Sequence, residues 1–307
     1  MQLSARVREI LGFYEGENPG VKNHLARLLM HGKLAGTGKM IILPVDQGFE
    51  HGPGRSYGVN PDAYHPHYHF QLAIDAGLSA YAAPLGWLEA GADTFAGSIP
   101  TLLKVNSGNS LLSKNLPPNQ AVTGSIQDAL RLGCVGIGFT IYPGSDSSLD
   151  MFEEIRELAR EAKSCGLIVV IWSYPRGNLS KEGETAIDTI GYGAHIAALL
   201  GAHVIKVKLP SAFLENPEAK KAYQQSNIRM ESLADRVRHV TECCFQGRRL
   251  VVFSGGDTKN VRDVVQDARD IHAGGGHGSI IGRNCFQRPR HEALALLEQL
   301  TNIYQAS

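Results

Sequence analysis

The sequence predicts a (β/α)₈ barrel, a TIM barrel, with a short N-terminal helical extension. Three observations lead to this fold class. Eight short apolar runs recur along the chain, segments with helical periodicity lie between many of them, and 307 residues suffice for a barrel of about 250 residues. Strands that alternate with helices form a parallel sheet with crossover connections, and eight such units can close into a barrel.

The predicted strands are rich in β-branched residues and apolar on both faces. Parallel strands buried on both sides have this composition. The eight runs cover residues 40–45, 79–84, 101–105, 135–141, 167–172, 203–208, 250–254 and 279–282.

The predicted helices show apolar residues at three-to-four spacing. The clearest is 148–165, where Phe152, Ile155 and Leu158 share one stripe and Gly166 marks the end. Similar stripes cover 64–76, 184–200, 231–244, 259–273 and 289–304. Residues 21–30 are amphipathic, so we expect residues 1–35 to form a helical extension. Because no linker or longer repeat interrupts the rest, residues 36–307 are expected to form one catalytic barrel domain.

Composition excludes several classes of protein. Lys plus Arg and Asp plus Glu both number 30, so the chain lacks the net positive charge that general binding to nucleic acid requires. A local anion site needs only a few donors and stays possible. No apolar run approaches the roughly 20 residues of a membrane span, and the N-terminus lacks a signal-peptide pattern. The five cysteines are odd in number and never spaced as CxxC, which predicts buried, reduced thiols in a cytoplasmic protein.

Catalytic residues of such a barrel follow the carboxyl ends of its strands. Asp46 follows the first strand, and three lysines (Lys104, Lys206 and Lys208) lie within the third and sixth strands. Buried lysines are rare, and one beside another cation has a lowered pKa, which makes its free amine a nucleophile for a carbonyl compound. Alternatively, Lys206 or Lys208 forms an ion pair with Asp46 or Glu50.

A phosphate site is predicted after the seventh and eighth strands. Ser254, Gly255 and Gly256 offer backbone N–H groups, and Gly282 and Arg283 add a cation from the neighbouring strand. These two loops form the recurrent phosphate site of the architecture. The alternative is a glycine turn beside a surface arginine.

The motifs DQGFEHGP, WSYPRG, VIKVK, SGG and GRN, in this order, resemble the archaeal-type class I fructose-bisphosphate aldolase family over residues 36–304. The resemblance implies reversible cleavage of fructose 1,6-bisphosphate to dihydroxyacetone phosphate and glyceraldehyde 3-phosphate through a lysine Schiff base, in glycolysis and gluconeogenesis. It also implies no metal or other cofactor and a homo-oligomer, often a decamer.

Site roles follow from the same resemblance. Lys206 matches the Schiff-base lysine; Lys206 and Lys208 share one strand face, so alternation alone does not separate them. Tyr174 matches the proton-transfer tyrosine, and Asp46 would position the carbinolamine or accept a proton. Trp172 would line the pocket for the sugar chain, and Arg176 would bind the second phosphate. Lys104 or Lys208 would keep Lys206 neutral or contact the substrate. Each residue also has a structural alternative. Tyr174 would be a tyrosine at the rim of the barrel and Trp172 a core residue. Asp46 would form an ion pair with a strand lysine, and Arg176 would be a surface arginine.

Three rival functions remain. The first is a sibling Schiff-base or transaldolase-like enzyme acting on another phosphorylated ketose or a ketoacid precursor; siblings usually have His at the position of Gln47. The second is a metal-dependent aldolase using His65, His67 and His69, which otherwise are polar loop residues. The third is a non-catalytic barrel that binds sugar phosphates.

Overall fold

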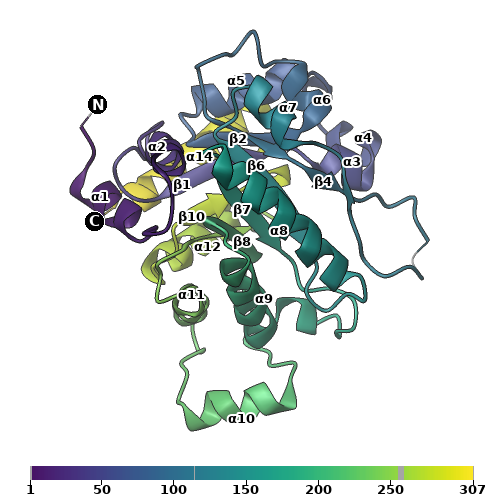
Figure 1. The fold of residues 1–307 in the computed structure, drawn as a ribbon, viewed down its shortest axis with the longest axis vertical. Helices are drawn as coiled ribbons and strands as arrows, with labels where there is room; N and C mark the ends of the chain where they lie inside the picture. Colours follow the sequence, from purple (N-terminus) through teal and green to yellow (C-terminus); the bar gives the residue numbers. More distant parts are fainter. Residues whose placement is uncertain (1, 114, 255–258, 307) are drawn as a thin grey trace.

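The computed structural model describes residues 2–113, 115–254 and 259–306. Eight parallel strands form a closed barrel in which each strand pairs with its neighbours in the chain and the last pairs with the first, which confirms the predicted fold class (Figure 1). The strands are β1 (Met40–Pro44), β2 (Ala80–Pro84), β3 (Thr101–Lys104), β6 (Gly136–Ile141), β7 (Ile168–Ser173), β8 (Val204–Lys208), β9 (Leu250–Ser254) and β10 (Gly278–Ile280). The predicted runs agree with these bounds to within 2 residues.

Helices surround the barrel (Figure 1). Those predicted from periodicity are α5 (Pro66–Asp75), α8 (Ser148–Ser164), α9 (Ile187–Leu199), α11 (Leu233–Cys243), α12 (Val261–Ala273) and α14 (Arg290–Gln305). The sequence did not predict the shorter elements, which are too brief to show a period. These are α3 (Gln47–His51), α4 (Pro53–Tyr57), η1 (Pro61–Tyr64), α6 (Leu85–Glu89), α7 (Ile126–Arg131), η2 (Gly183–Thr185), α10 (Pro217–Gln225), α13 (Arg283–Phe286) and the hairpin of β4 (Asn106–Ser107) with β5 (Ala121–Val122).

The N-terminal residues form α1 (Ala5–Gly12) and α2 (Pro19–Leu29), which cover the amino end of the barrel. Side chains of Ser4 and Asn18 cap the two helices by accepting from the backbone N–H groups of Val7 and Val21. The buried faces of both helices belong to the same apolar cluster as the inner side chains of the strands. The two helices therefore close the end of the barrel opposite to the carboxyl ends of its strands.

Alternation along the strands divides the core into two parts. On β8, Val204 packs in the cluster inside the barrel, whereas Ile205 and Val207 pack outside it against the helices. The largest inner side chain is Trp172 on β7, and a Cβ at Gly138 of β6 would lie 1.8 Å from its ring. A side chain at position 138 is therefore incompatible with the indole inside the barrel.

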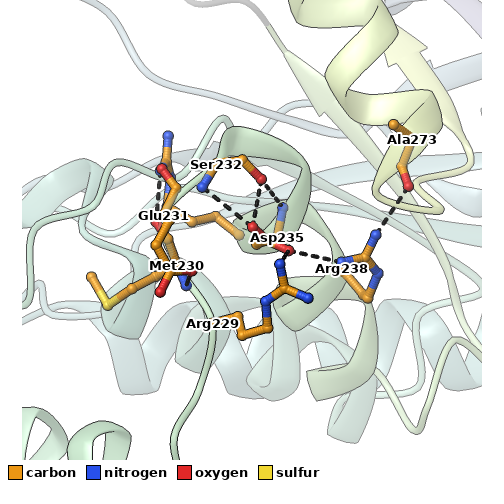
Figure 2. A network of polar contacts seen from close by, with 8 residues as sticks. Arg229, Met230, Glu231, Ser232, Asp235, Arg238 and Ala273 are labelled. Carbon is orange, nitrogen blue, oxygen red and sulfur yellow. Dashed lines mark hydrogen bonds and ion pairs between the residues drawn. The ribbon is translucent and has the colours of Figure 1, made fainter.

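The α11 helix begins at a network of polar contacts on the surface (Figure 2). Ser232 and Asp235 form a capping box, in which the Ser232 Oγ accepts from the Asp235 N–H at 3.0 Å and the Asp235 carboxylate accepts in return. The same carboxylate lies 3.0 Å from Arg238 and 3.5 Å from Arg229. These contacts satisfy backbone donors of the first turn and fix where α11 starts.

All five cysteines are free thiols. Cys134, Cys244 and Cys285 are buried as predicted, but the prediction was wrong for Cys165, which is exposed, and for Cys243, which is half-buried. Cys165 follows the last residue of α8, where the helix end meets solvent. In the described residues no helix combines the length and apolar character needed to cross a membrane.

Candidate active site

A cavity of about 100 Å³ opens at the carboxyl end of the barrel. Eight of the predicted site residues line it, among the residues Pro44, Asp46, Gln47, Glu50, His51, Tyr174, Arg176, Lys206, Lys208, Ser254, Ile280, Ile281, Gly282, Arg283 and Asn284. Gly255 and Gly256 lie outside the described residues. A larger cavity of about 1130 Å³ lies outside the barrel between α8, α9, α10 and α11, and no predicted site residue lines it.

Lys206 is the most deeply placed basic residue of the cavity wall, with 5% of its surface exposed. Its Nζ lies 5.6 Å from the ring centre of Trp172 and 5.5 Å from that of Tyr174. Burial lowers the pKa of Lys206 to about 8; Asp46 and Glu50 oppose this shift, and Lys104 and Arg283 add to it. The lowered pKa makes the neutral amine more accessible near neutral pH than it is for an exposed lysine.

Lys208 occupies a different depth on the same strand. Its side chain is 23% exposed, and its Nζ lies 3.3 Å from a carboxylate oxygen of Glu184 in η2. The sequence analysis gave Asp46 or Glu50 as the possible ion-pair partner of Lys208. It missed the actual partner, Glu184, which lies 24 residues before Lys208 in the chain. Depth in the barrel separates the two lysines where strand alternation could not.

Two carboxylates face the lysines from the end of β1. Asp46 is 8% exposed, and Glu50 lies one helical turn later, where its backbone N–H donates to the Asp46 carbonyl oxygen. Burial and the neighbouring Asp46 raise the pKa of Glu50. Sequence reasoning considered Glu50 only as an ion-pair partner, although the i, i+4 spacing in DQGFE already places both acids on one side of a turn.

Tyr174 extends from the end of β7 and keeps its proton. Burial raises the pKa of its phenol well above the usual range, and Asp46 and Glu50 raise it further, while a hydrogen bond with Ser254 acts in the opposite direction. The ring therefore carries an O–H group, able to donate a proton, within the wall that also holds Lys206.

Arg176, two residues after Tyr174, is held by aromatic rings. Its guanidinium lies 4.9 Å from the ring centre of Tyr142 and 5.9 Å from that of Tyr174. Tyr142 was not among the predicted site residues. It directly follows the fourth predicted strand, residues 135–141, and its uncharged side chain gave no reason to assign it to the site. The stacking orients a cation toward the cavity mouth.

The fold brings the described residues of the predicted phosphate site together at one cavity. Ser254 ends β9, and Gly282 and Arg283 follow β10, so all three line the cavity. A Cβ at position 282 would lie 2.8 Å from the carbonyl oxygen of Pro44, so glycine permits close approach of the two chain segments.

Trp172 and Lys104 do not belong to the cavity wall among the described residues. Both are buried inside the barrel, and the Lys104 Nζ lies 5.9 Å from the ring centre of Trp172. Strand pairing places Trp172 beside Lys206. The indole therefore lies beside Lys206 from within the barrel.

The three clustered histidines are not at the cavity. His69 Nε2 lies 2.7 Å from the Ala63 carbonyl oxygen, and His67 Nε2 lies 3.0 Å from that of Ala90. His65 caps α5 by accepting from the His67 N–H. Among the described residues, His, Cys, Asp and Glu nowhere form a group of three suited to hold a metal ion.

A parallel barrel with a buried lysine of lowered pKa, a protonated tyrosine and a carboxylate in one cavity has the functional groups of a lysine-dependent aldolase. The model of the DeoC/LacD aldolase family matches residues 40–288, so the chain belongs to this family. Its relatives include a fructose-bisphosphate aldolase class 1 of Thermoproteus tenax, 35% identical, with 83% of this chain and 86% of that protein covered. They also include a probable fructose-bisphosphate aldolase class 1 of Chlamydia muridarum, 34% identical, with 94% and 85% covered.

A solved structure gives the same result for the fold. An archaeal fructose-1,6-bisphosphate aldolase, with its catalytic lysine covalently bound to the carbinolamine intermediate, superposes with a TM-score of 0.74 at 30% identity. The match covers 90% of this chain and 97% of that one. The predicted family and fold class are both confirmed.

Proposed function

We propose that the protein is a class I fructose-bisphosphate aldolase, which cleaves fructose 1,6-bisphosphate reversibly to dihydroxyacetone phosphate and glyceraldehyde 3-phosphate. The observation that carries the proposal is the position of Lys206. Its amine is buried and has a lowered pKa, and it shares one cavity with Tyr174, Asp46 and Arg283. The matched aldolases carry the proposed activity in their names.

The reaction begins with the free amine of Lys206. Its lone pair forms a bond to the ketone carbon, and the carbonyl oxygen gains a proton to give a carbinolamine. Tyr174 is the donor we assign to the departing water, because its phenol is protonated and its ring contacts Lys206. Loss of water leaves a protonated imine that can accept an electron pair.

Carbon–carbon cleavage follows. Asp46 accepts the proton of the hydroxyl on the fourth carbon, and the electron pair of the bond between the third and fourth carbons moves toward the iminium nitrogen. The aldehyde leaves, and the proton that Asp46 accepted passes to the Tyr174 phenolate. The restored phenol then protonates the third carbon of the enamine. Water adds to the resulting imine and gives a proton back to Tyr174, and collapse of the carbinolamine releases dihydroxyacetone phosphate and restores Lys206.

The two phosphates orient the chain of the sugar. We assign one phosphate to Ser254, Gly282 and Arg283, together with Gly255 and Gly256 of the intervening loop. We assign the other to Arg176 and Lys208, which follow β7 and end β8. Contacts far from the broken bond reduce the entropy that the reaction must overcome.

We also propose that the enzyme requires no metal, is located in the cytoplasm and forms a homo-oligomer, with a decamer as the proposed size. The outer surface supports self-association, since Leu149, Tyr192 and Leu199 on α8 and α9 are 70%, 68% and 66% exposed. Large apolar side chains exposed on outer helices are a feature of subunit interfaces. Light scattering on purified protein measures the subunit count; a monomer at all concentrations would contradict this part of the proposal.

The decisive experiment is borohydride reduction with fructose 1,6-bisphosphate or dihydroxyacetone phosphate present, followed by intact mass measurement and peptide mapping. We expect a substrate-dependent adduct on Lys206 in wild-type protein and none in Lys206→Met. An adduct on Lys208 would keep the mechanism and change the nucleophile. Loss of activity with a chelator, without any adduct, would contradict the Schiff-base mechanism.

A sibling enzyme acting on a different phosphorylated ketose would also give the adduct. Initial rates with a panel of ketose mono- and bisphosphates separate the two functions. The proposal requires the highest kcat/KM for fructose 1,6-bisphosphate, because Arg176, Lys208 and Arg283 offer enough cations in one cavity for two phosphates. Preference for a monophosphate would favour the sibling.

A further inference from the structure

Two aromatic rings hold the side chain of Arg176 in the wall of the active-site cavity. The guanidinium carbon lies 4.9 Å from the ring centre of Tyr142 and 5.9 Å from that of Tyr174, and the Nη1 lies 3.5 Å from the Tyr142 hydroxyl oxygen. Within the described parts of the chain, Arg176 takes part in no ion pair. The rings therefore orient the guanidinium while leaving its positive charge available for an anion.

Backbone pairing beyond β6 and β7 brings these side chains together. The Tyr174 N–H donates to the Ile141 carbonyl oxygen, and the Arg176 N–H donates to that of Pro143, both at 3.0 Å. The two segments thus stay side by side past the ends of their strands. Tyr142 lies between the two carbonyl acceptors, which places its ring beside the guanidinium.

The Tyr142 ring is itself held in place by Gln120. Both side chains are buried, and the Gln120 Nε2 donates to the Tyr142 hydroxyl at 2.7 Å. The Gln120 Oε1 accepts from the Lys104 Nζ at 3.1 Å. Because an ammonium group only donates, the amide oxygen must face Lys104 and the amide nitrogen must face Tyr142. The ring cannot swing away from Arg176 without breaking a buried hydrogen bond.

The two phosphate sites of the proposed aldolase lie at different places relative to the nucleophile. Burial lowers the pKa of Lys206, and Lys104 and Arg283 add to this shift. Burial raises the pKa of Tyr142, and the charge of Arg176 opposes that rise. The phosphate on the first carbon of the sugar, next to the ketone that Lys206 attacks, therefore fits the site of Arg283. The phosphate on the sixth carbon, at the other end of the sugar, is left for Arg176.

We propose that Tyr142 is a positioning residue that sets substrate specificity: its ring, fixed by Gln120, holds Arg176 where the guanidinium binds the phosphate on the sixth carbon. The enzyme would thereby favour ketose bisphosphates over ketoses phosphorylated only on the first carbon, a role that rests on the proposed aldolase function. An arginine side chain loses rotamer entropy when it binds a ligand, and a ring that orients it beforehand reduces this cost.

The test compares the cleavage of fructose 1,6-bisphosphate and of fructose 1-phosphate by wild type and Tyr142→Leu. We expect KM for the bisphosphate to rise about tenfold while kcat stays within about twofold, because the lost contact lies far from the broken bond. KM for fructose 1-phosphate should be unchanged, since this substrate has no phosphate for Arg176. Tyr64→Leu is the matched control: Tyr64 is 47% exposed and does not line the cavity, so both KM values should stay at the wild-type level.

A double-mutant cycle determines whether Tyr142 acts through Arg176. Arg176→Met alone should raise KM for the bisphosphate at least as much as Tyr142→Leu does. In the Arg176→Met background, Tyr142→Leu should then cause no further rise, because the side chain that the ring orients is already gone. Equal effects of Tyr142→Leu in both backgrounds would overturn the inference.

A second variant covers the case in which Tyr142→Leu does not fold. Arg176→Lys keeps the charge but lacks the planar group that stacks on the rings, so it should also raise KM for the bisphosphate and spare fructose 1-phosphate. An unchanged KM for the bisphosphate, or an equal loss with both substrates, would contradict the assigned role. Failure of the proposed function looks different, since wild-type protein itself would then cleave neither substrate and give no adduct on Lys206.

Discussion

The two ends of the barrel bury ionisable groups in opposite ways. At the amino end, the Glu17 carboxylate lies 2.7 Å from the Lys163 Nζ and 3.0 Å from the His203 Nε2. Burial opposes ionisation there, but hydrogen bonds from His203 and Lys163 lower the pKa of Glu17 to about 2. At the carboxyl end, burial shifts Lys206, Glu50 and Tyr174 toward their neutral forms.

The difference separates stability from reactivity. His203 Nδ1 accepts from the Val169 N–H at 2.7 Å, so its Nε2 carries the proton that faces Glu17. The Glu17 carboxylate thus lies close to two basic side chains, and these contacts join the segment after α1 to α8, to β7 and to the residue before β8. The carboxyl end instead gathers four Lys and Arg side chains and two carboxylic acids around a cavity, where neutral forms are available for proton transfer and nucleophilic attack.

The largest expected effect is that of Lys206→Met. We expect turnover to fall by at least about 10³-fold and the borohydride adduct to disappear, because no other cavity residue supplies a buried free amine in the proposed mechanism. The thermal midpoint should not fall, since the change removes a buried charged group. If Lys206→Met retained turnover, reactivity could not be assigned to the ionisable groups at the carboxyl end of the barrel.

Tyr174→Phe should have the next largest effect. Loss of the phenol removes the proposed proton donor, so we expect kcat to fall by about 10²–10⁴-fold. Lys206 remains, so borohydride should still trap the substrate on it after long incubation, but more slowly, because Tyr174 also protonates the departing water in the proposed dehydration. Stopped-flow turnover and intact mass on the same sample measure both quantities; an adduct that never forms, even after long incubation, would assign Tyr174 to binding.

Glu17→Gln tests the amino end. We expect the free energy of unfolding to fall by about 1–2 kcal/mol at neutral pH, between the values for surface and buried ion pairs, with kcat unchanged. Because the folded-state pKa of Glu17 is lowered, its contribution is present above its usual value of 4.5 and is lost as the pH falls toward about 2. Urea unfolding at neutral and acidic pH should therefore show the difference between variant and wild type shrinking in acid.

The smallest effect is expected at the surface network of Figure 2. Ser232→Ala removes the side-chain acceptor that caps α11, which should lower stability by about 1 kcal/mol and leave kcat/KM unchanged. Ser232→Asn, another good capping residue, is the control and should retain most of the stability. A change in kcat/KM would mean that α11 communicates with the cavity.

The sequence by itself determined the barrel, because each strand and long helix is encoded by a local pattern of apolar residues. The eight runs and six of the helical stripes lie where they were predicted. Position at a strand end was also enough to bring Asp46, Tyr174, Arg176, Lys206, Ser254 and Arg283 to one cavity. Parallel strands end at the same rim, so a position in the sequence fixes a position at that rim.

Only the tertiary structure decided the environment of each group. It buried Lys206 more deeply than Lys208 and paired Lys208 with Glu184. It also placed acceptors of the β4–β5 hairpin around Lys104 and kept the histidines of the α5 region away from the cavity. Burial and hydrogen-bond partners come from segments far apart in the chain, and they set the pKa of a side chain. The sequence could therefore name the lysines, but only the folded chain could show that Lys206 is buried in the cavity whereas Lys208 is partly exposed and paired with Glu184.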